Sequence, residues 1–235
     1  MIEINVYTDG ELIQLKEQIQ FLEIEITLLA SQKADLEKQV RYYGILYNKH
    51  LGDLLEAILR KHKEKLQKKA SDNRESKQAY QEAAKEYENF TNNFEESKKF
   101  EQAVLTADDQ ILLKRSFKKA CKLCHPDKVA TEYKQQAQEI FIALREAYDA
   151  NDLKKVLEIL QQLEKGIFKT ISESVTEKDK LFLYFEQLKN SIIKLRTDIK
   201  SLMESDAYRV SSSVQDYESY FENLRLQLQA ELNKL

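Results

Sequence analysis

The sequence contains very few of the residues that interrupt helices: four glycines and one proline among 235 residues. Charged residues account for 33% of the chain and apolar residues for 42%. Such a shortage of turn-forming residues leaves little room for loops. It predicts an all-α protein made of long helices, with a helical share well above that of an ordinary globular protein.

Long apolar runs and targeting signals are also missing. No stretch approaches the roughly 18 apolar residues of a membrane span, and residues 1–7 lack the basic and apolar regions of a signal peptide. These absences predict a cytoplasmic protein with no membrane partner. Its two cysteines, Cys121 and Cys124, are then most simply free thiols on one face of a helix.

Charge and motifs argue against further classes of function. A net charge of −3 gives no general attraction to nucleic acid. Basic residues gather at 60–69 and 114–128, but no aromatic residue is interleaved with the run from Arg60 to Lys65, which favours a solvated helix end over a nucleic-acid site. Phosphate-binding, nucleophile-elbow and zinc-protease motifs are absent, so we expect no enzyme and no cofactor.

The most informative stretch, 114–128, joins a basic helix to the proline. On a helical wheel the apolar and basic residues separate into two halves. The apolar half holds Leu112, Leu113, Phe117, Ala120, Cys121, Leu123 and Cys124, and the basic half holds Lys114, Arg115, Lys118, Lys119 and Lys122. The helix should end near Cys124, because a proline disfavours the α conformation in the residue before it and donates no backbone hydrogen bond. We expect His125, Pro126 and Asp127 to form a stiff, exposed turn.

These residues resemble the J domain of the DnaJ/Hsp40 co-chaperones, whose signature is a His-Pro-Asp turn between a basic amphipathic helix and a second, antiparallel helix. The family's spacing in the second helix is repeated by Phe141, Leu144, Ala147 and Tyr148. The resemblance covers residues 105–165, about a quarter of the chain. The chain departs from the family pattern at Cys124, where an aromatic residue is usual. A recognisable first helix, a Gly/Phe-rich linker and a cysteine-rich zinc module are missing.

The resemblance implies docking on the ATPase domain of an Hsp70 chaperone. Lys114, Lys118 and Lys122 would meet an acidic surface of that partner. The turn, through His125 and Asp127, would set the geometry that triggers ATP hydrolysis in Hsp70. Exposed positive charge mainly raises the rate of encounter, and a short rigid turn loses little entropy on docking.

An alternative interpretation starts from Cys121, Cys124 and His125, which match the C-x-x-C-H motif of haem attachment. Haem attachment requires export, for which the sequence shows no signal. A structural zinc site needs four ligands, and the other histidines, His50 and His62, lie on a distant predicted helix. Buried packing of two small side chains is the better account, and no metal is expected.

Two heptad patterns predict long coiled-coil helices on either side of this segment. The first runs from Leu12 to His50 and the second from Leu181 to Leu202. The sequence leaves open whether they pair with each other or between two copies of the chain, and a homodimer is the expectation. Residues 2–7 alternate apolar and polar side chains as a strand does, but no partner strand is visible.

The predicted architecture has three parts. A coiled-coil helical hairpin spans 1–104 and reverses at 69–75, a compact J-like helical domain spans 105–166, and coiled-coil helices span 167–235. The first functional hypothesis is a co-chaperone whose J-like domain stimulates Hsp70 while its coiled-coil arms bind a client or partner protein. The alternative is a structural coiled-coil scaffold whose J-like segment no longer engages Hsp70. The sequence identifies neither the Hsp70 nor the client.

Overall fold

The computed structural model describes residues 9–70, 74–100, 102–175 and 177–235. Helices account for 86% of the chain, and the described residues contain no strand, so the all-α prediction is confirmed. The alternating segment 2–7 lies outside the described residues. None of the helices in these ranges is both long and apolar enough to cross a membrane.

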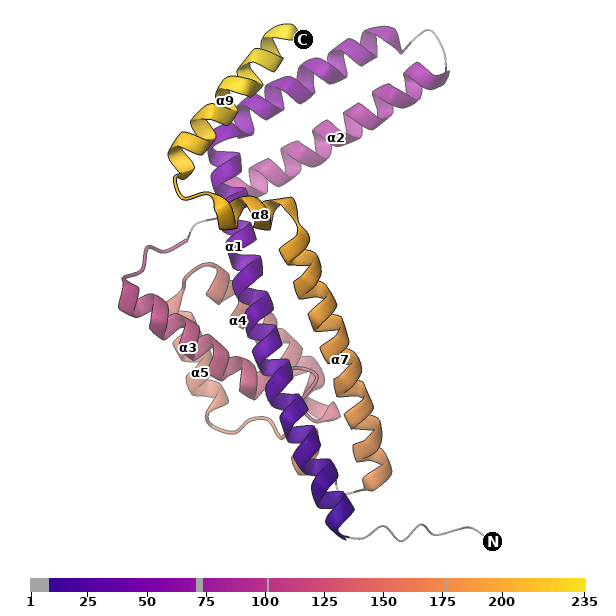
Figure 1. Ribbon diagram of the computed structural model, residues 1–235, viewed down its shortest axis with the longest axis vertical. Helices are drawn as coiled ribbons and strands as arrows, with labels where there is room; N and C mark the ends of the chain where they lie inside the picture. The colour runs from indigo at the N-terminus through magenta and orange to yellow at the C-terminus, as the bar shows by residue number, and fades with distance from the viewer. Residues whose placement is uncertain (1–8, 71–73, 101, 176) are drawn as a thin grey trace. The chain divides into compact units, whose positions relative to one another are not determined.

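Long helices joined by short connections make up the chain (Figure 1). In order they are α1 (Asp9–Lys69), α2 (Arg74–Lys98), α3 (Ala107–Cys124), the 3-10 turn η1 (Thr131–Tyr133), α4 (Lys134–Asp149), α5 (Leu153–Leu163), α6 (Ile171–Ser174), α7 (Lys178–Glu204), α8 (Asp206–Ser213) and α9 (Tyr217–Lys234). α1 runs for 61 residues without a break because it contains no proline. Its last residue and the first of α2 both fall within the predicted reversal at 69–75.

The helices group into two compact units. Unit 1 combines Met1–Lys38 with Gln102–Glu204, and unit 2 combines Gln39–Glu101 with Ser205–Leu235. α1 therefore contributes its first part to unit 1 and its remainder to unit 2. The three parts predicted from the sequence follow the order of the chain, whereas each unit joins segments that are far apart in it.

Two separate apolar cores hold unit 1 together. The first lies among α3, α4 and α5 and is completed by Ala34 of α1, whose side chain is 1% exposed. The second lies between α1 and α7. Its buried residues are Leu15, Ile19, Ile26, Leu181, Tyr184, Leu188 and Ile192.

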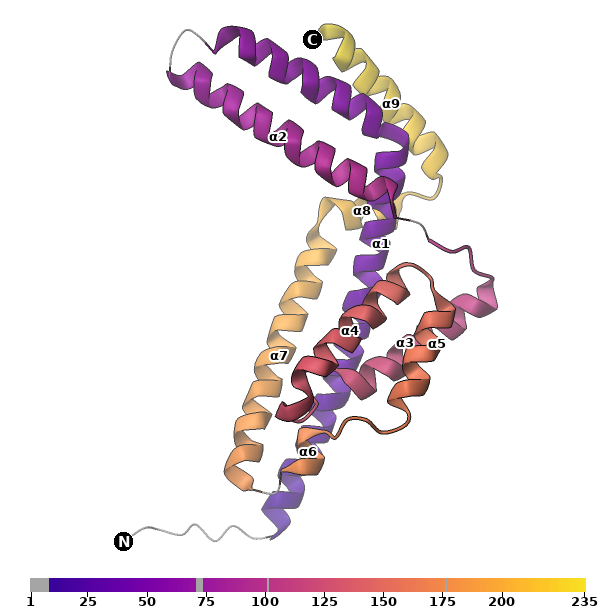
Figure 2. The same cartoon turned by 180° about the vertical axis from the view of Figure 1, so that it is seen from behind.

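Within unit 1, the first part of α1 and α7 lie side by side and run in the same direction (Figures 1 and 2). Near their starts, the Lys178 ammonium lies 3.1 Å from the Glu11 carboxylate. Further along, the Lys33 ammonium lies 2.5 Å from the Asp198 carboxylate. Most of the buried apolar residues between these contacts belong to the two predicted heptad patterns. In this unit the two patterns pair with each other within one chain.

In unit 2, α2 runs antiparallel to the second part of α1. The Asn48 amide donates a hydrogen bond to the Ser97 hydroxyl at 2.9 Å, late in α2. Eight residues further along α1, the Glu56 carboxylate accepts a hydrogen bond at 3.2 Å from the Tyr87 hydroxyl, which is earlier in α2. The order of these contacts fixes the antiparallel direction.

Aromatic side chains join α9 to α1 in unit 2. The ring centroids of Tyr43 and Phe221 are 6.1 Å apart, and those of Tyr47 and Phe221 are 6.3 Å apart. His50 stacks on the same Phe221 ring, with centroids 4.8 Å apart. Phe221 is 1% exposed and forms the centre of this third core with Tyr43 and Leu51.

Candidate functional site

α3 ends where the sequence predicts, and a local cap fixes its start. The Thr106 hydroxyl accepts a hydrogen bond from the Asp109 backbone amide at 3.2 Å and donates one to the Asp109 carboxylate at 2.7 Å. This reciprocal pair caps the helix, and Asp108 and Asp109 place negative charge at the positive end of the helix dipole. The helix ends at Cys124, two residues before Pro126.

The two faces of α3 match the helical wheel. The buried face contributes Leu113, Phe117, Ala120, Cys121 and Cys124 to the first core of unit 1. The exposed face holds Lys114, Arg115, Lys118, Lys119 and Lys122. Leu112 departs from the prediction, because it is 41% exposed.

Local hydrogen bonds hold the turn after α3. The Lys128 backbone amide donates to the His125 carbonyl at 2.9 Å, and the Asp127 backbone amide donates to Nδ1 of the His125 ring at 3.3 Å. His125 has φ −63° and ψ 123°, the extended conformation that a following proline favours. The turn is therefore defined by its own residues.

α4 returns antiparallel to α3. The rings of Phe117 and Tyr148 stack with centroids 4.0 Å apart. At the other end of the pair, the rings of His125 and Phe141 meet edge to face at 5.2 Å. The residues whose spacing predicted the second helix therefore mark the side of α4 that packs in this core.

The predicted exposure of the turn is wrong for His125 and Pro126. Both are buried, and His125 keeps 7% of its surface. Asp127 is half-buried and lines a cavity of about 390 Å³ together with Gln187 and Asn190 of α7. The physical reason is tertiary packing. His125 packs against the Phe141 ring of α4, and residues of α7 line the same cavity as Pro126 and Asp127. The local residue pattern does not contain that information.

Burial lowers the pKa of His125 to about 4, although the neighbouring Asp127 carboxylate acts in the opposite direction. The Lys128 ammonium adds to the lowering. The imidazole is therefore neutral at neutral pH. Because Nδ1 accepts a hydrogen bond, its proton is assigned to Nε2.

The three lysines predicted to bind a partner have different surroundings. The Lys114 ammonium lies 2.6 Å from the Asp35 carboxylate of α1, although 63% of the lysine side chain remains exposed. Lys118 and Lys122 are exposed and form no ion pair with any residue that the structure describes. Of these three lysines, the two that are free to meet a partner therefore lie on the last two turns of α3.

Sequence reasoning missed a buried polar cluster beside the turn, formed by Glu23, Thr27, Lys128, Ser172 and Tyr184. The Lys128 ammonium donates to the Thr27 hydroxyl at 3.2 Å and to the Lys122 carbonyl at 3.1 Å. The Glu23 carboxylate accepts from the hydroxyls of Ser172 and Tyr184, both at 3.0 Å.

Burial dominates the electrostatics of this cluster. It lowers the pKa of Lys128, an effect that the Glu23 charge opposes, and it raises the pKa of Tyr184. Lys128 is 3% exposed and Glu23 is 7% exposed. The only trace in the sequence is a pair of polar residues, Glu23 and Thr27, one helical turn apart beside the heptad pattern; their partners lie far away in the chain.

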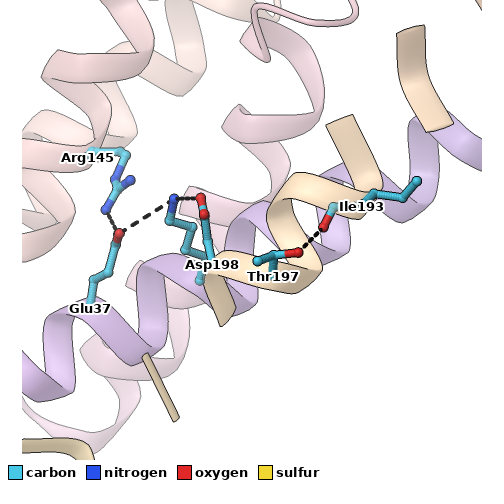
Figure 3. Close-up of polar contacts among 6 residues, drawn as sticks. Glu37, Arg145, Ile193, Thr197 and Asp198 are labelled. Atoms are coloured by element: carbon cyan, nitrogen blue, oxygen red, sulfur yellow. Dashed lines mark hydrogen bonds and ion pairs between the residues drawn. The ribbon is translucent and has the colours of Figure 1, made fainter. Parts of the chain in front are cut away.

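A second set of charged contacts fastens α1 to α4 and α7 (Figure 3). Arg145 of α4 pairs with Glu37 of α1. The Lys33 ammonium lies 3.9 Å from the Glu37 carboxylate and 2.5 Å from that of Asp198 in α7. Lys33 and Glu37 flank Ala34, so these pairs surround the point where α1 enters the first core.

The two cysteines are structural. Both are free and fully buried, and burial raises the pKa of the Cys124 thiol to about 12 and that of Cys121 further. Thiolates, the form that binds metals and reacts, are therefore disfavoured at neutral pH. Among the described residues, no group of three or more histidine, cysteine, aspartate or glutamate side chains is placed to hold a metal ion.

The arrangement is suited to recognition. It combines exposed cations on a rigid helix with a turn in which Asp127 lines a cavity. A partner with an acidic surface would meet the cations first. Comparison of the chain with protein-family models, with curated proteins and with solved structures gives no match.

Proposed function

We propose that this chain is a cytoplasmic J-domain co-chaperone that docks on an Hsp70 and stimulates its ATPase. The observation that carries the proposal is the basic face of α3, which leads directly into the His125-Pro126-Asp127 turn and an antiparallel α4. The fold proposed for it is a compact J-like helical domain flanked by coiled-coil helices. ATP hydrolysis would take place in the Hsp70.

Lys118 and Lys122 would make the first contact with an acidic surface of the Hsp70. Surface charge at long range accelerates encounter and is screened by salt. Asp127, at the half-exposed end of the turn, would then reach the partner at the cavity mouth. The interaction is expected to be modest in affinity and to weaken as ionic strength rises.

The helices outside the J-like segment would supply arms for a client or partner protein and for a second copy of the chain. Exposed apolar side chains on α1 support this part of the proposal. Phe21 is 72% exposed, Ile24 50% and Leu28 46%. Their spacing of three and four residues places them in one stripe along the helix.

Steady-state ATPase assays with a bacterial-type Hsp70 test the function. The wild-type chain should stimulate turnover, and stimulation should fall with added salt. Asp127→Asn should remove most of the stimulation while preserving the fold, since the residue is half-buried and its backbone, not its carboxylate, holds the turn.

Charge variants provide the matched control for this assay. Replacing Lys118 and Lys122 by glutamate should raise the chain concentration needed for stimulation at least tenfold. Reversing Lys154, another exposed lysine, on α5, should leave that concentration unchanged. Equal effects of all three reversals would show that net charge alone, and not the α3 face, is responsible.

The burial of His125 and Pro126 favours a second candidate function, a coiled-coil scaffold whose J-like segment is purely structural. In that case neither Hsp70 binding nor ATPase stimulation would be measurable at any salt concentration, and Asp127→Asn would be silent. A folded wild-type protein that gives no stimulation would decide for the scaffold.

A further inference from the structure

We propose that the buried polar cluster is an autoinhibitory latch, which keeps the His125-Pro126-Asp127 turn covered until the latch opens. The proposal rests on the Hsp70-stimulating function given above and adds its regulation. Neighbouring parts of the site differ in exposure. Lys118 and Lys122 face solvent, whereas His125 and Pro126, a few residues further along the chain, are buried. A partner attracted by the cations would meet a closed turn.

Lys128 is placed to control the turn directly. Its backbone amide closes the turn on the His125 carbonyl, and its ammonium bonds both to the last turn of α3, at Lys122, and to Thr27 of α1. One side chain thus ties the turn, the end of the basic helix and the covering helix together.

The segment after the turn is held by its backbone as well. The Ala130 amide donates to the Lys169 carbonyl at 2.9 Å, and the Ile171 amide donates to the Lys128 carbonyl at 3.0 Å. This pairing places α6 next to the turn. Glu23 then binds Ser172 of α6 and Tyr184 of α7. The covering helices α1, α6 and α7 are therefore linked to the turn through one connected set of hydrogen bonds.

Most of the cluster lies outside the apolar cores of unit 1. The two cores are separate sets of apolar side chains, and Tyr184 is the one cluster residue that belongs to either of them. Separating an apolar interface exposes surface that water does not favour. Separating Lys128 from Glu23 and Thr27 instead allows two buried ionisable groups to regain hydration. That hydration offsets much of the free energy lost with the broken polar contacts.

Contacts around Ala34 keep α1 attached when the cluster opens. Ala34 is 1% exposed in the first core and is flanked by Lys33 and Glu37, whose ion pairs reach α7 and α4. Opening at Glu23 and Thr27 would leave these contacts in place. Opening therefore releases the turn locally and does not dissociate α1 from unit 1.

Two readouts on the whole chain test the latch. The first is hydrogen exchange of the backbone amides of Ala130 and Ile171, whose hydrogen bonds join the segment after the turn to the segment that leads into α6. The second is the chain concentration that gives half-maximal stimulation of the Hsp70 ATPase. The variants Glu23→Gln and Tyr184→Phe weaken the cluster from the covering side, away from the basic face.

We expect Glu23→Gln to speed exchange of these amides by about tenfold, since a charge-assisted hydrogen bond is replaced by a neutral one. The half-maximal concentration should fall by the same factor, because apparent affinity scales with the fraction of open molecules. Tyr184→Phe, which removes one oxygen atom, should shift both readouts in the same direction. Glu25→Gln is the control: it removes an α1–α7 ion pair with Arg196 outside the cluster and should change neither readout.

The possible results separate the latch from the proposed function. Unchanged exchange in folded Glu23→Gln and Tyr184→Phe overturns the latch without reference to Hsp70. Faster exchange with an unchanged half-maximal concentration also overturns it, while stimulation by the wild type keeps the proposed function. Faster exchange with no stimulation by any chain overturns both. If Glu23→Gln does not fold, Tyr184→Phe decides alone.

Discussion

At the scale of single residues, burial of His125 predicts an acid-sensitive fold. Its pKa is about 4 in the folded chain against 6.5 in the ordinary state, so the unfolded chain binds a proton first as pH falls. The resulting loss of folding stability is absent above about pH 7 and grows as the pH falls from about 6.5 to about 4. Below that pH it amounts to about 3 kcal/mol.

Urea unfolding at several pH values, followed by circular dichroism, measures this contribution against His125→Gln. The glutamine variant does not titrate, although it loses the contact with the Phe141 ring. The comparison therefore uses the slope of stability with pH and not its absolute value. Wild type should lose stability more steeply than the variant between pH 6.5 and pH 4, and parallel curves would mean that the imidazole is accessible.

The same residue shows how much of the site could be predicted from the sequence. The cap at Thr106, the end of α3 at Cys124 and the exposed basic face follow from local rules on capping, proline and helical periodicity. The depth of His125 does not, because it comes from tertiary packing such as the contact with the Phe141 ring of α4. Lys128, next to the turn, looks like one more surface lysine, and nothing local reveals that its partner is Thr27.

At the scale of elements, the heptad patterns predicted that α1 and α7 each bury an apolar stripe, but not the partner of that stripe. An apolar seam predicts that a helix packs against another helix, but many different helices could be that partner. The structure pairs the two seams in parallel within unit 1. It also gives α1 a second face, with Ala34 in the first core, which a seam defined by one stripe of residues does not anticipate.

The close approach of α1 and α2 in unit 2 gives a prediction for this helix pair. A Cβ at Gly52 would lie 2.1 Å from the Phe94 ring, which is 4% exposed and has little room to move. Gly52→Ala should therefore destabilise the chain by about 1–3 kcal/mol, despite the gain of nearly 1 kcal/mol in helix propensity.

Gly44 is the matched control for that substitution. It lies in the same helix, and a Cβ there would meet nothing within 4 Å. Gly44→Ala should stabilise the chain by about 0.5–1 kcal/mol, because only the propensity changes. Thermal unfolding of both variants measures the difference, and equal shifts in Tm would show that α1 and α2 do not approach closely at Gly52.

At the scale of the whole molecule, the intrachain pairing of α1 and α7 restricts how two copies of the chain could associate. Leu15, Ile19 and Ile26 are already buried against α7, so a homodimer has to use another face. The exposed stripe of Phe21, Ile24 and Leu28 lies on the opposite side of α1. Contiguous apolar surface of this kind marks interaction sites.

Light scattering after size exclusion tests this assignment. We expect a mass of about twice 27.6 kDa at high concentration for the wild type, and a single-chain mass when Phe21 and Leu28 are both replaced by serine. The double variant should unfold like the wild type, since neither residue belongs to a core. As a control, Ile26→Ser should lower the stability of the chain by about 2–5 kcal/mol. A single-chain mass for the wild type at every concentration would mean that pairing within the chain fully accounts for both heptad patterns, and the stripe would then be left to a client.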